Sequence, residues 1–202
     1  MFDIGITSNL KEYYSGYIDF IDHYWLNYFE KKNINYYLIP NKKKLSVRML
    51  DKINLLIITG GNDVSNFLKT SRIRNNIENN LINICLKKKI PILGICRGAQ
   101  LLNKNLGGKI KKIKNHMRTR HDVFFTKNNI LKKKFLNVNS FHNDGIKKND
   151  LSKKLNMLAN DKDENVEMFI SKNKKIIGTM WHPEREKNTQ LLDNLIKYMN
   201  KK

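Results

Sequence analysis

A cysteine between two glycines is the residue of this sequence best suited to chemistry. Cys96 lies in the segment G-I-C-R-G, which follows an apolar run and passes directly into a helical pattern. This is the nucleophile-elbow arrangement with cysteine in place of serine. Gly94 and Gly98 allow a tight turn and a close approach of the neighbouring backbone. The following helix directs its amide N–H groups and its positive dipole end at the sulfur, which favours the thiolate.

A nucleophilic cysteine requires a base and a group that orients the base, and the C-terminal part of the chain offers both. His182 follows an apolar run and precedes Pro183, which stiffens the turn. Glu184 lies two residues beyond His182, where its carboxylate can hold the imidazole. Taken alone, His182 is more often an ordinary polar turn residue, but together with the elbow it is predicted to be the base. Its distance along the chain from Cys96 is no obstacle, because such groups are assembled in space.

An oxyanion hole requires two backbone donors near the sulfur. The elbow supplies one of them, the N–H of Arg97 directly after the nucleophile. The second is predicted to be the N–H of Gly61, because a glycine lets the backbone approach without a Cβ. Gly60 and Gly61 follow the apolar run 53–59, and Gly60 is expected to border the substrate. A plain turn is the alternative interpretation of this glycine pair.

Polar side chains near these motifs are candidates for binding a substrate. Gln100 lies one turn into the elbow helix on the side of Cys96, so its amide can reach a bound molecule. The alternative for Gln100 is a solvent-facing position. A loop after a short strand is predicted to contact a charged ligand through Ser140, Phe141 and His142. The imidazole of His142 is also a rival base.

The remaining histidines and cysteines predict neither a metal ion nor a cofactor. His116 and His121 flank a basic loop, and no carboxylate or cysteine accompanies them at the spacing typical of metal ligands. Cys85 lies on the apolar side of the helical run 77–89 and is expected to be inert core. The use of only two cysteines indicates a reducing compartment rather than a disulfide framework.

The elements that must position these residues alternate along the first half of the chain. Apolar strands are separated by stretches of helical periodicity, which predicts a parallel sheet with right-handed crossovers. Strands are expected at 2–7, 35–39, 53–59 and 90–95, and helices at 17–32, 45–52 and 70–89. Sites in open sheets form beyond the C-terminal ends of the strands, which is where Gly60, Gly61 and Cys96 fall.

After Gly108 the pattern changes, and strand-like pieces follow one another closely. Antiparallel additions at one edge of the sheet would account for them. These strands are expected at 121–126, 135–138, 155–159, 166–171 and 176–180, with a closing helix at 188–199. A chain of 202 residues is long enough for one sizeable α/β domain, and a single domain spanning 1–202 is expected.

The charge of the chain is strongly positive, with 39 Lys and Arg against 18 Asp and Glu and a net charge of +21. Lysines are spread along the whole sequence among Asn and Ile. This distribution is expected of solvent-exposed faces and of a coding bias, and it does not require a binding function. No nucleic-acid-binding signature with interleaved aromatic residues is present, so nucleic acid is not an expected partner; a polyanionic or phosphate-bearing substrate is the alternative.

No signal peptide is recognisable and no apolar run approaches the roughly 18 residues that span a bilayer. A soluble, cytoplasmic protein is expected.

Four segments together resemble the class I glutamine amidotransferase superfamily, and more narrowly its free-standing γ-glutamyl hydrolase branch. They are G-I-C-R-G-A-Q at the elbow, T-G-G-N-D-V at 59–64, N-S-F-H at 139–142 and G-T-M-W-H-P-E at 178–184. Their order matches as well, and the resemblance covers essentially the whole chain. An arginine after the cysteine is typical of the hydrolase branch. The resemblance implies a flavodoxin-like three-layer α/β fold with a mostly parallel sheet and a triad of Cys96, His182 and Glu184.

The resemblance also implies a reaction. A cysteine-dependent amidohydrolase would cleave a small γ-glutamyl amide through a γ-glutamyl thioester and release glutamate. The amides of Gly61 and Arg97 would form the oxyanion hole, while Gln100 and the Ser140–Phe141 loop would hold the α-amino and α-carboxylate groups. No cofactor is implied.

The leaving group is less constrained than the glutamyl part. The segments 17–32 and 110–121 resemble the amidotransferase-like proteins of surface-polysaccharide clusters. The Lys/Asn/Ile-rich sequence is similar to γ-glutamyl-CDP-amidate hydrolases of capsule biosynthesis, which implies a nucleotide-linked substrate. The alternatives are a γ-glutamyl-γ-aminobutyrate-type hydrolase and a glutaminase subunit that passes ammonia to a separate synthetase. A binding or regulatory protein without the chemistry is a further alternative, as is a nucleic-acid binder on charge alone. The oligomeric state is not indicated.

Overall fold

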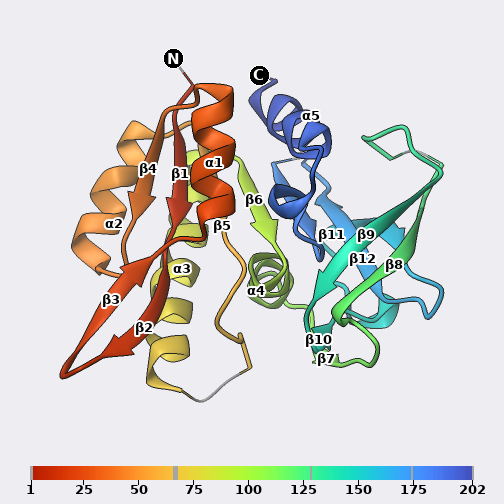
Figure 1. The fold of residues 1–202 in the computed structure, drawn as a ribbon, viewed down its shortest axis with the longest axis horizontal. Coiled ribbons are helices and arrows are strands. Elements are labelled where there is room, and N and C mark those ends of the chain that lie inside the picture. The colour runs from red at the N-terminus through yellow and green to blue at the C-terminus, as the bar shows by residue number, and fades with distance from the viewer. Residues whose placement is uncertain (1, 66–67, 128, 174, 202) are drawn as a thin grey trace.

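Nine strands form one mixed sheet through the middle of the molecule, in the order β4-β1-β5-β6-β13-β12-β11-β8-β9 (Figure 1). The computed structural model describes residues 2–65, 68–127, 129–173 and 175–201. Helices cover both faces of the first half of this sheet, and the strands of the second half curve away from it (Figure 1). The result is the predicted α/β architecture, with three layers around the parallel strands.

The first half of the sheet is parallel and has the flavodoxin-like strand order. Its strands are β4 (Tyr36–Ile39), β1 (Ile4–Thr7), β5 (Leu55–Ile58), β6 (Ile92–Ile95) and β13 (Ile176–Thr179). All four neighbouring pairs run parallel, and Thr179 of β13 lies beside Ile95 of β6. Every residue of β1, β5, β6 and β13 is buried, as near-continuous apolar runs predict for central parallel strands.

The second half of the sheet is antiparallel, as the sequence predicts for most of its later strands. The strand expected at 176–180 was wrongly grouped with them, because β13 is buried on both faces and pairs in parallel with β6. β12 (Val166–Ser171) pairs with β13, β11 (Leu155–Asn160) pairs with β12, and β8 (Met117–Phe125) and β9 (Phe135–Phe141) follow. A separate two-stranded piece joins β7 (Lys111–Lys112) to β10 (Asp144–Gly145). This half therefore extends the parallel sheet at the edge beyond β13.

Two groups of helices bury the two faces of the parallel strands. Residues of α1 (His23–Lys32) and α5 (Gln190–Asn200) share one core with Leu55 and Ile57 of β5. Residues of α3 (Lys69–Lys88) and α4 (Arg97–Asn105) share the other core with Leu56 and Ile58, and α2 (Lys43–Met49) flanks them. The alternation along β5 follows from the two-residue period of a strand, which sends successive side chains to opposite faces. Three 3₁₀ turns complete the described elements: Leu50–Lys52, Lys148–Asp150 and Pro183–Arg185.

The helix predicted at 17–32 is wrong in its first part. A β-hairpin of β2 (Asn9–Tyr13) and β3 (Gly16–Phe20) occupies this region, and α1 begins only at His23. Two carboxylates explain the difference. Asp19 accepts hydrogen bonds from Ser8 Oγ and from Asn41 Nδ2, each at 2.6 Å, which holds β3 extended. Asp22 accepts from the N–H of Tyr24 and caps the helix, so the helical period starts after it.

Two further boundaries differ from the predicted ones. β8 begins at Met117, four residues before the expected strand at 121–126. β9 continues through Asn139, Ser140 and Phe141, which were predicted to lie in a loop after a strand ending at 138. Both differences have the same cause. β8 and β9 pair with each other from Phe124↔Phe135 to Met117↔Phe141, and this pairing extends each strand. Such long-range pairing cannot be recognised from local periodicity.

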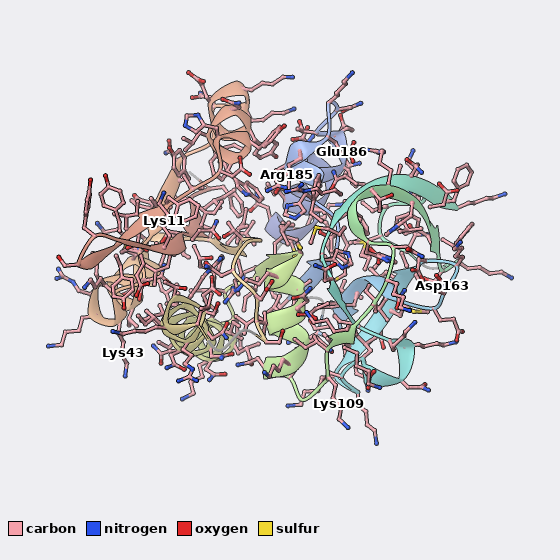
Figure 2. All side chains as sticks on the ribbon, turned by 60° about the horizontal axis from the view of Figure 1, so that its bottom comes forward. Lys11, Lys43, Lys109, Asp163, Arg185 and Glu186 are labelled. Atoms are coloured by element: carbon pink, nitrogen blue, oxygen red, sulfur yellow. The ribbon has the colours of Figure 1, made fainter. Side chains whose placement is uncertain are left out.

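Charged side chains are distributed over the outside of the molecule (Figure 2). Lys11, Lys43 and Lys109 lie on well-separated parts of the surface, whereas Arg185 and Glu186 lie close together (Figure 2). Within the described ranges no helix is both long enough and apolar enough to cross a membrane. The longest described helix, α3, carries charged residues along its length.

Candidate active site

Three segments meet at the carboxyl ends of neighbouring parallel strands. Gly60 and Gly61 follow β5, Cys96 follows β6, and His182 lies three residues after the end of β13. These strands are adjacent in the order β5-β6-β13, so their C-terminal ends lie side by side. The sheet therefore brings together residues that are far apart in the sequence.

Cys96 has the strained backbone of a nucleophile elbow. Its φ of 51° and ψ of −106° lie outside the regions that a cysteine ordinarily adopts. The neighbouring contacts maintain this strain: the N–H of Cys96 donates to Thr179 O at 2.7 Å, and α4 begins at the next residue. Gly98 has no room for a Cβ, which would clash with the carbonyl of Ile58, so α4 packs directly on β5.

His182 is buried and fixed on several sides. Its Nδ1–H donates to Glu184 Oε1 at 2.7 Å, so Nε2 is the nitrogen left to face the site. The main chain of His182 is held by Asn139, whose Oδ1 accepts from the N–H and whose Nδ2 donates to the carbonyl. The ring of Phe141 packs edge-on against the imidazole, with centroids 5.7 Å apart. The sequence did not predict the supporting role of Asn139, because it depends on β9 lying beside this turn.

The imidazole, the elbow and the glycine turn contact one another. A Cβ placed on Gly60 would lie 2.6 Å from His182 Cε1, 3.4 Å from His182 Nε2 and 3.6 Å from Cys96 Cβ. Only glycine therefore fits at this position. Burial alone lowers the pKa of His182, but its electrostatic and hydrogen-bond interactions with Glu184 and Cys96 outweigh burial and raise this pKa to about 10. The imidazolium is therefore the stable form beside the sulfur at neutral pH.

The two predicted oxyanion donors belong to the elbow and to the glycine turn. Arg97 is the first residue of α4, so its N–H belongs to the first turn, where the helix supplies no acceptor. Gly61 has a φ of +84°, and a Cβ there would clash with Asn9 Oδ1. Glycine adopts this left-handed conformation at little cost, so it can present its amide where another residue would be strained.

Arg74 holds the glycine turn in place. Its guanidinium donates to Thr59 O and to Gly60 O, each at 3.0 Å, and the side chain is completely buried. Asn9 Oδ1 and Asn62 Oδ1 accept from the same guanidinium. The sequence-based prediction missed Arg74, although its position in a predicted helix, four residues before Glu78, was the available signal.

Glu78 joins this network to the elbow helix. It accepts from Arg74 Nε at 3.0 Å, from Thr7 Oγ1 at 2.7 Å and from the guanidinium of Arg97. Burial raises the pKa of Glu78, but the two guanidinium groups outweigh burial and hold it below its usual value. The side chain of Arg97 thus points into the protein, while its N–H remains at the elbow.

The predicted substrate-binding residues divide into two groups. Phe141 lies against His182, as described, and is partly exposed. Gln100 is buried and donates to Asp144 O at 2.8 Å, so it is not solvent-facing. Ser140 donates to His116 O at 2.6 Å, and the ring of His142 lies 5.1 Å from that of His116 with its Nδ1 against Asp144 O. Ser140 and His142 therefore have structural partners on the side of β8 and β10.

A cleft of about 240 Å³ opens beside the imidazole and the glycine turn. Its lining includes Phe20 of the unexpected hairpin, Trp25 of α1 and Arg185 next to the site. Arg185 donates to Asp22 Oδ2 at 2.9 Å and stacks on Phe141, with the guanidinium 5.0 Å from the ring centre. The hairpin and the start of α1 thus form one wall of the cleft.

The structure is a flavodoxin-like α/β fold with a strained cysteine at the C-terminal end of the parallel strand β6. The model of the Peptidase C26 family matches residues 4–184, and the chain belongs to this family of class I glutamine amidotransferase-like proteins. The family establishes a hydrolase of the glutamine amidotransferase-like amidohydrolase type. The resemblance predicted from the four segments is confirmed.

Curated relatives refine this assignment. The chain is 42% identical over 145 residues to the gamma-glutamyl-CDP-amidate hydrolase of Campylobacter jejuni, covering 69% of this chain and 68% of that protein. It is 30% identical over 188 residues to the putative glutamine amidotransferase-like protein YvdE of Lactococcus lactis, covering 79% and 78%. It is also 30% identical over 168 residues to one subunit of the glutamine-hydrolyzing GMP synthase of Methanococcus vannielii, covering 76% and 79%.

Solved structures agree with this fold. A putative GMP synthase subunit from Thermoplasma acidophilum superposes with a TM-score of 0.76 at 22% identity, covering 98% of this chain and 92% of that one. A glutamine amidotransferase from Thermotoga maritima superposes with a TM-score of 0.72 at 20% identity, covering 97% and 81%. At these identities the likeness concerns the fold alone.

Proposed function

We propose that this chain hydrolyses a γ-glutamyl amide, with Cys96 as the nucleophile, His182 as the proton carrier and Glu184 as the group that orients it. One observation carries the proposal: a strained Cys96 lies beside the ring of His182, whose other nitrogen is hydrogen-bonded to buried Glu184. This is the arrangement that an activated thiolate requires.

The reaction proceeds in two steps. The Cys96 thiolate attacks the γ-carbonyl carbon, and the N–H groups of Gly61 and Arg97 stabilise the oxyanion. The carbon–nitrogen bond breaks as the His182 imidazolium gives its proton to the leaving nitrogen, which leaves a γ-glutamyl thioester on the sulfur. A water molecule then attacks the thioester and gives a proton to His182, so that glutamate is released and the thiolate–imidazolium pair is restored.

For the substrate we propose γ-glutamyl-CDP-amidate, converted to cytidine diphosphoramidate for capsular polysaccharide. The relative from Campylobacter jejuni at 42% identity supports this choice. The net charge of +21 is also compatible with a diphosphate leaving group. Gln100, Phe141 and Gly60 are proposed to contact the glutamyl group, and Ser140 and His142 are proposed to support this binding region.

A glutaminase is the second candidate. It is favoured by 30% identity to part of a GMP synthase whose name describes it as glutamine-hydrolyzing. Such a protein would use the same thioester but release ammonia from free glutamine to a separate synthetase. The two candidates differ in which γ-glutamyl compound is turned over by the isolated chain.

The test compares wild type with Cys96→Ala on a panel of γ-glutamyl compounds: a nucleotide-linked amide, γ-glutamyl-γ-aminobutyrate and free glutamine. The isolated wild-type chain should show its highest kcat/KM on the nucleotide-linked amide, and rapid quenching should trap a γ-glutamyl adduct on Cys96. The variant should fold normally and lose turnover by about 10⁴-fold or more. Substantial turnover by folded Cys96→Ala would refute the mechanism, and a preference for glutamine would favour the glutaminase.

A further inference from the structure

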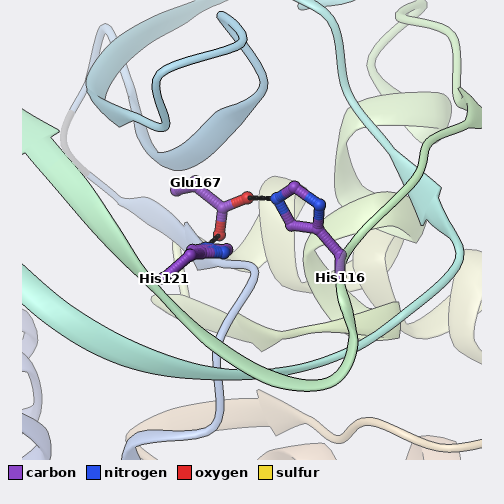
Figure 3. A group of neighbouring side chains, drawn as sticks. All are labelled: His116, His121 and Glu167. Atoms are coloured by element: carbon purple, nitrogen blue, oxygen red, sulfur yellow. Dashed lines mark ion pairs between the residues drawn. The ribbon is translucent and has the colours of Figure 1, made fainter.

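A second group of chemically capable side chains lies in the antiparallel half of the molecule. His116 precedes β8, His121 lies within β8, and Glu167 projects from the neighbouring part of β12 (Figure 3). The side chains point toward a common centre, with the carboxylate between the two imidazoles (Figure 3). None of the three takes part in the proposed reaction.

The two imidazoles lie at ion-pair distance from opposite oxygens of the Glu167 carboxylate. His116 Nε2 lies 3.5 Å from Glu167 Oε1, and His121 Nε2 lies 3.5 Å from Glu167 Oε2. One ligand atom from each residue lies within 4.8 Å of the others. A tetrahedral ion with bonds of about 2.0–2.1 Å places its ligand atoms about 3.4 Å apart. The spacing of the three side chains is therefore close to that of ligands around one ion.

Three of the four polar atoms directed at this centre, His121 Nε2 and both carboxylate oxygens of Glu167, have no hydrogen-bond partner among the described residues. The fourth, His116 Nε2, lies 3.0 Å from Asp161 Oδ2. His116 is 4% exposed and Glu167 is 1% exposed. Leaving the polar atoms of His121 and Glu167 buried and unpaired is costly, so a positively charged partner is expected beside the Glu167 carboxylate.

The surroundings orient the ligands for this purpose. His116 Nδ1–H donates to Lys114 O at 2.7 Å, which leaves Nε2 facing the carboxylates of Asp161 and Glu167. Asp161 Oδ2 lies 3.0 Å from His116 Nε2 and adds negative charge beside the centre. The adjoining cavity of about 370 Å³, lined by His116, His121 and Asp161 among others, provides an access path.

We propose that His116, His121 and Glu167 bind one divalent transition-metal ion of the zinc class. Two imidazoles and a carboxylate are ligands that zinc prefers, and the fourth position would face Asp161 or the adjoining cavity. The ion would join the start of β8 to β12. A proton shared between His116 and the two carboxylates is the alternative positive partner, and metal titration separates the two possibilities.

The position of the ion also connects it to the candidate active site. Glu167 O accepts from the N–H of Met180 at 2.8 Å, and Met180 is the residue directly after β13. The proposed ion would therefore support the segment that leads to His182. The metal proposal itself does not depend on the proposed reaction.

The test uses the full chain carrying Cys96→Ala, because the thiol and imidazole of the candidate active site would themselves bind zinc. After treatment with a chelator and dialysis, calorimetric titration with ZnCl₂ should show one ion per chain. The midpoint of thermal unfolding should rise by about 5 °C when Zn²⁺ exceeds its Kd about a hundredfold. Co²⁺ in place of Zn²⁺ should give the visible absorption of a tetrahedral site, which tests the geometry without any change to the ligands.

Ligand variants provide the decisive comparison. His121→Ala and the nearly isosteric Glu167→Gln should each weaken Zn²⁺ binding by about tenfold to a hundredfold and cut the thermal shift at the same Zn²⁺ concentration to about half or less. His23→Ala, which removes an exposed histidine of α1, is the matched control and should bind as its parent does. No binding by the parent, or equal binding by the ligand variants and the control, would overturn the proposal.

Discussion

At the scale of single residues, the candidate site depends on pairs of groups that change each other's properties. His182 is nearly fully buried, which by itself disfavours the imidazolium, yet Glu184 and Cys96 reverse this effect and raise its pKa to about 10. The hydrogen bond from Nδ1–H to Glu184 also fixes the ring so that Nε2 faces the site. The carboxylate therefore has an electrostatic role and an orienting role.

Glu184→Gln separates the carboxylate charge from its shape. An amide in this position no longer stabilises the imidazolium, so kcat should fall by about a hundredfold or more. KM should change much less, because Glu184 is directed at His182 rather than at the proposed substrate. Steady-state kinetics of both proteins check this expectation. A loss of kcat/KM through KM alone would show that Glu184 contributes to binding instead.

The same variant predicts a difference in the pH dependence of stability. Because the folded-state pKa of His182 is raised, its stabilising contribution is complete below about pH 6.5 and is lost as pH rises toward 10. Within this window the wild-type free energy of unfolding should fall by up to about 1.4 kcal/mol per pH unit from this group. Glu184→Gln should lower the pKa of His182, so the pH range over which His182 makes the free energy of unfolding fall should become smaller. Urea unfolding of both proteins near pH 6.5 and pH 9.5 measures the difference; parallel pH profiles would contradict it.

At the scale of elements, the glycine turn after β5 is held by a helix that contributes nothing to the reaction itself. Arg74 of α3 binds the carbonyls of Thr59 and Gly60, and Glu78 one turn later binds the side chain of Arg97. The network therefore joins the two segments that carry the proposed oxyanion donors to one rigid helix. Backbone donors need this support, because their stabilising effect depends on fixed geometry.

Arg74→Lys tests this positioning role while keeping the charge. A lysine cannot reproduce the fork of contacts to the two carbonyls, so the turn should lose its fixed position. We expect kcat to fall by about tenfold to a hundredfold with a smaller change in KM. Arg48→Lys, at an exposed position of α2, is the matched control and should be unaffected. Wild-type kcat in a folded Arg74→Lys protein would show that the turn does not need this support.

At the scale of the whole molecule, one continuous sheet carries two different halves. The parallel strands place the candidate site at their C-terminal ends, and the antiparallel strands add β9, whose Asn139 and Phe141 support His182. The continuity of this sheet supports the proposal of a single domain over 1–202. The charge of +21 is spread over the surface, as the positions of Lys11, Lys43 and Lys109 illustrate (Figure 2).

This charge predicts how turnover responds to salt. If the substrate is an anionic nucleotide-linked amide, kcat/KM should fall about tenfold from about 20 mM to about 500 mM salt, because screening removes electrostatic attraction. The value of kcat should be unchanged, and a neutral γ-glutamyl amide should show little dependence. Parallel measurements on the two substrates check this. The same salt response for both would indicate a general effect on the protein rather than attraction of the substrate.

The sequence by itself determined much of the fold and which residues are proposed for the candidate site. Buried parallel strands appear as continuous apolar runs, and the elbow glycines are required by local backbone geometry, so both can be recognised from neighbouring residues. The hairpin at Asn9–Phe20 and the extension of β9 were missed, because they depend on Asp19 and on strand pairing across the chain.

Only the tertiary structure decided which distant side chains share a space. The Arg74–Glu78–Arg97 network joins two helices, and it was not visible from either one. No carboxylate accompanies His116 and His121 in the sequence, yet Glu167, far along the chain on β12, lies beside both in the fold. The physical reason is the same in both cases: local sequence specifies elements, but the pairing of strands and the packing of helices determine which buried charges meet.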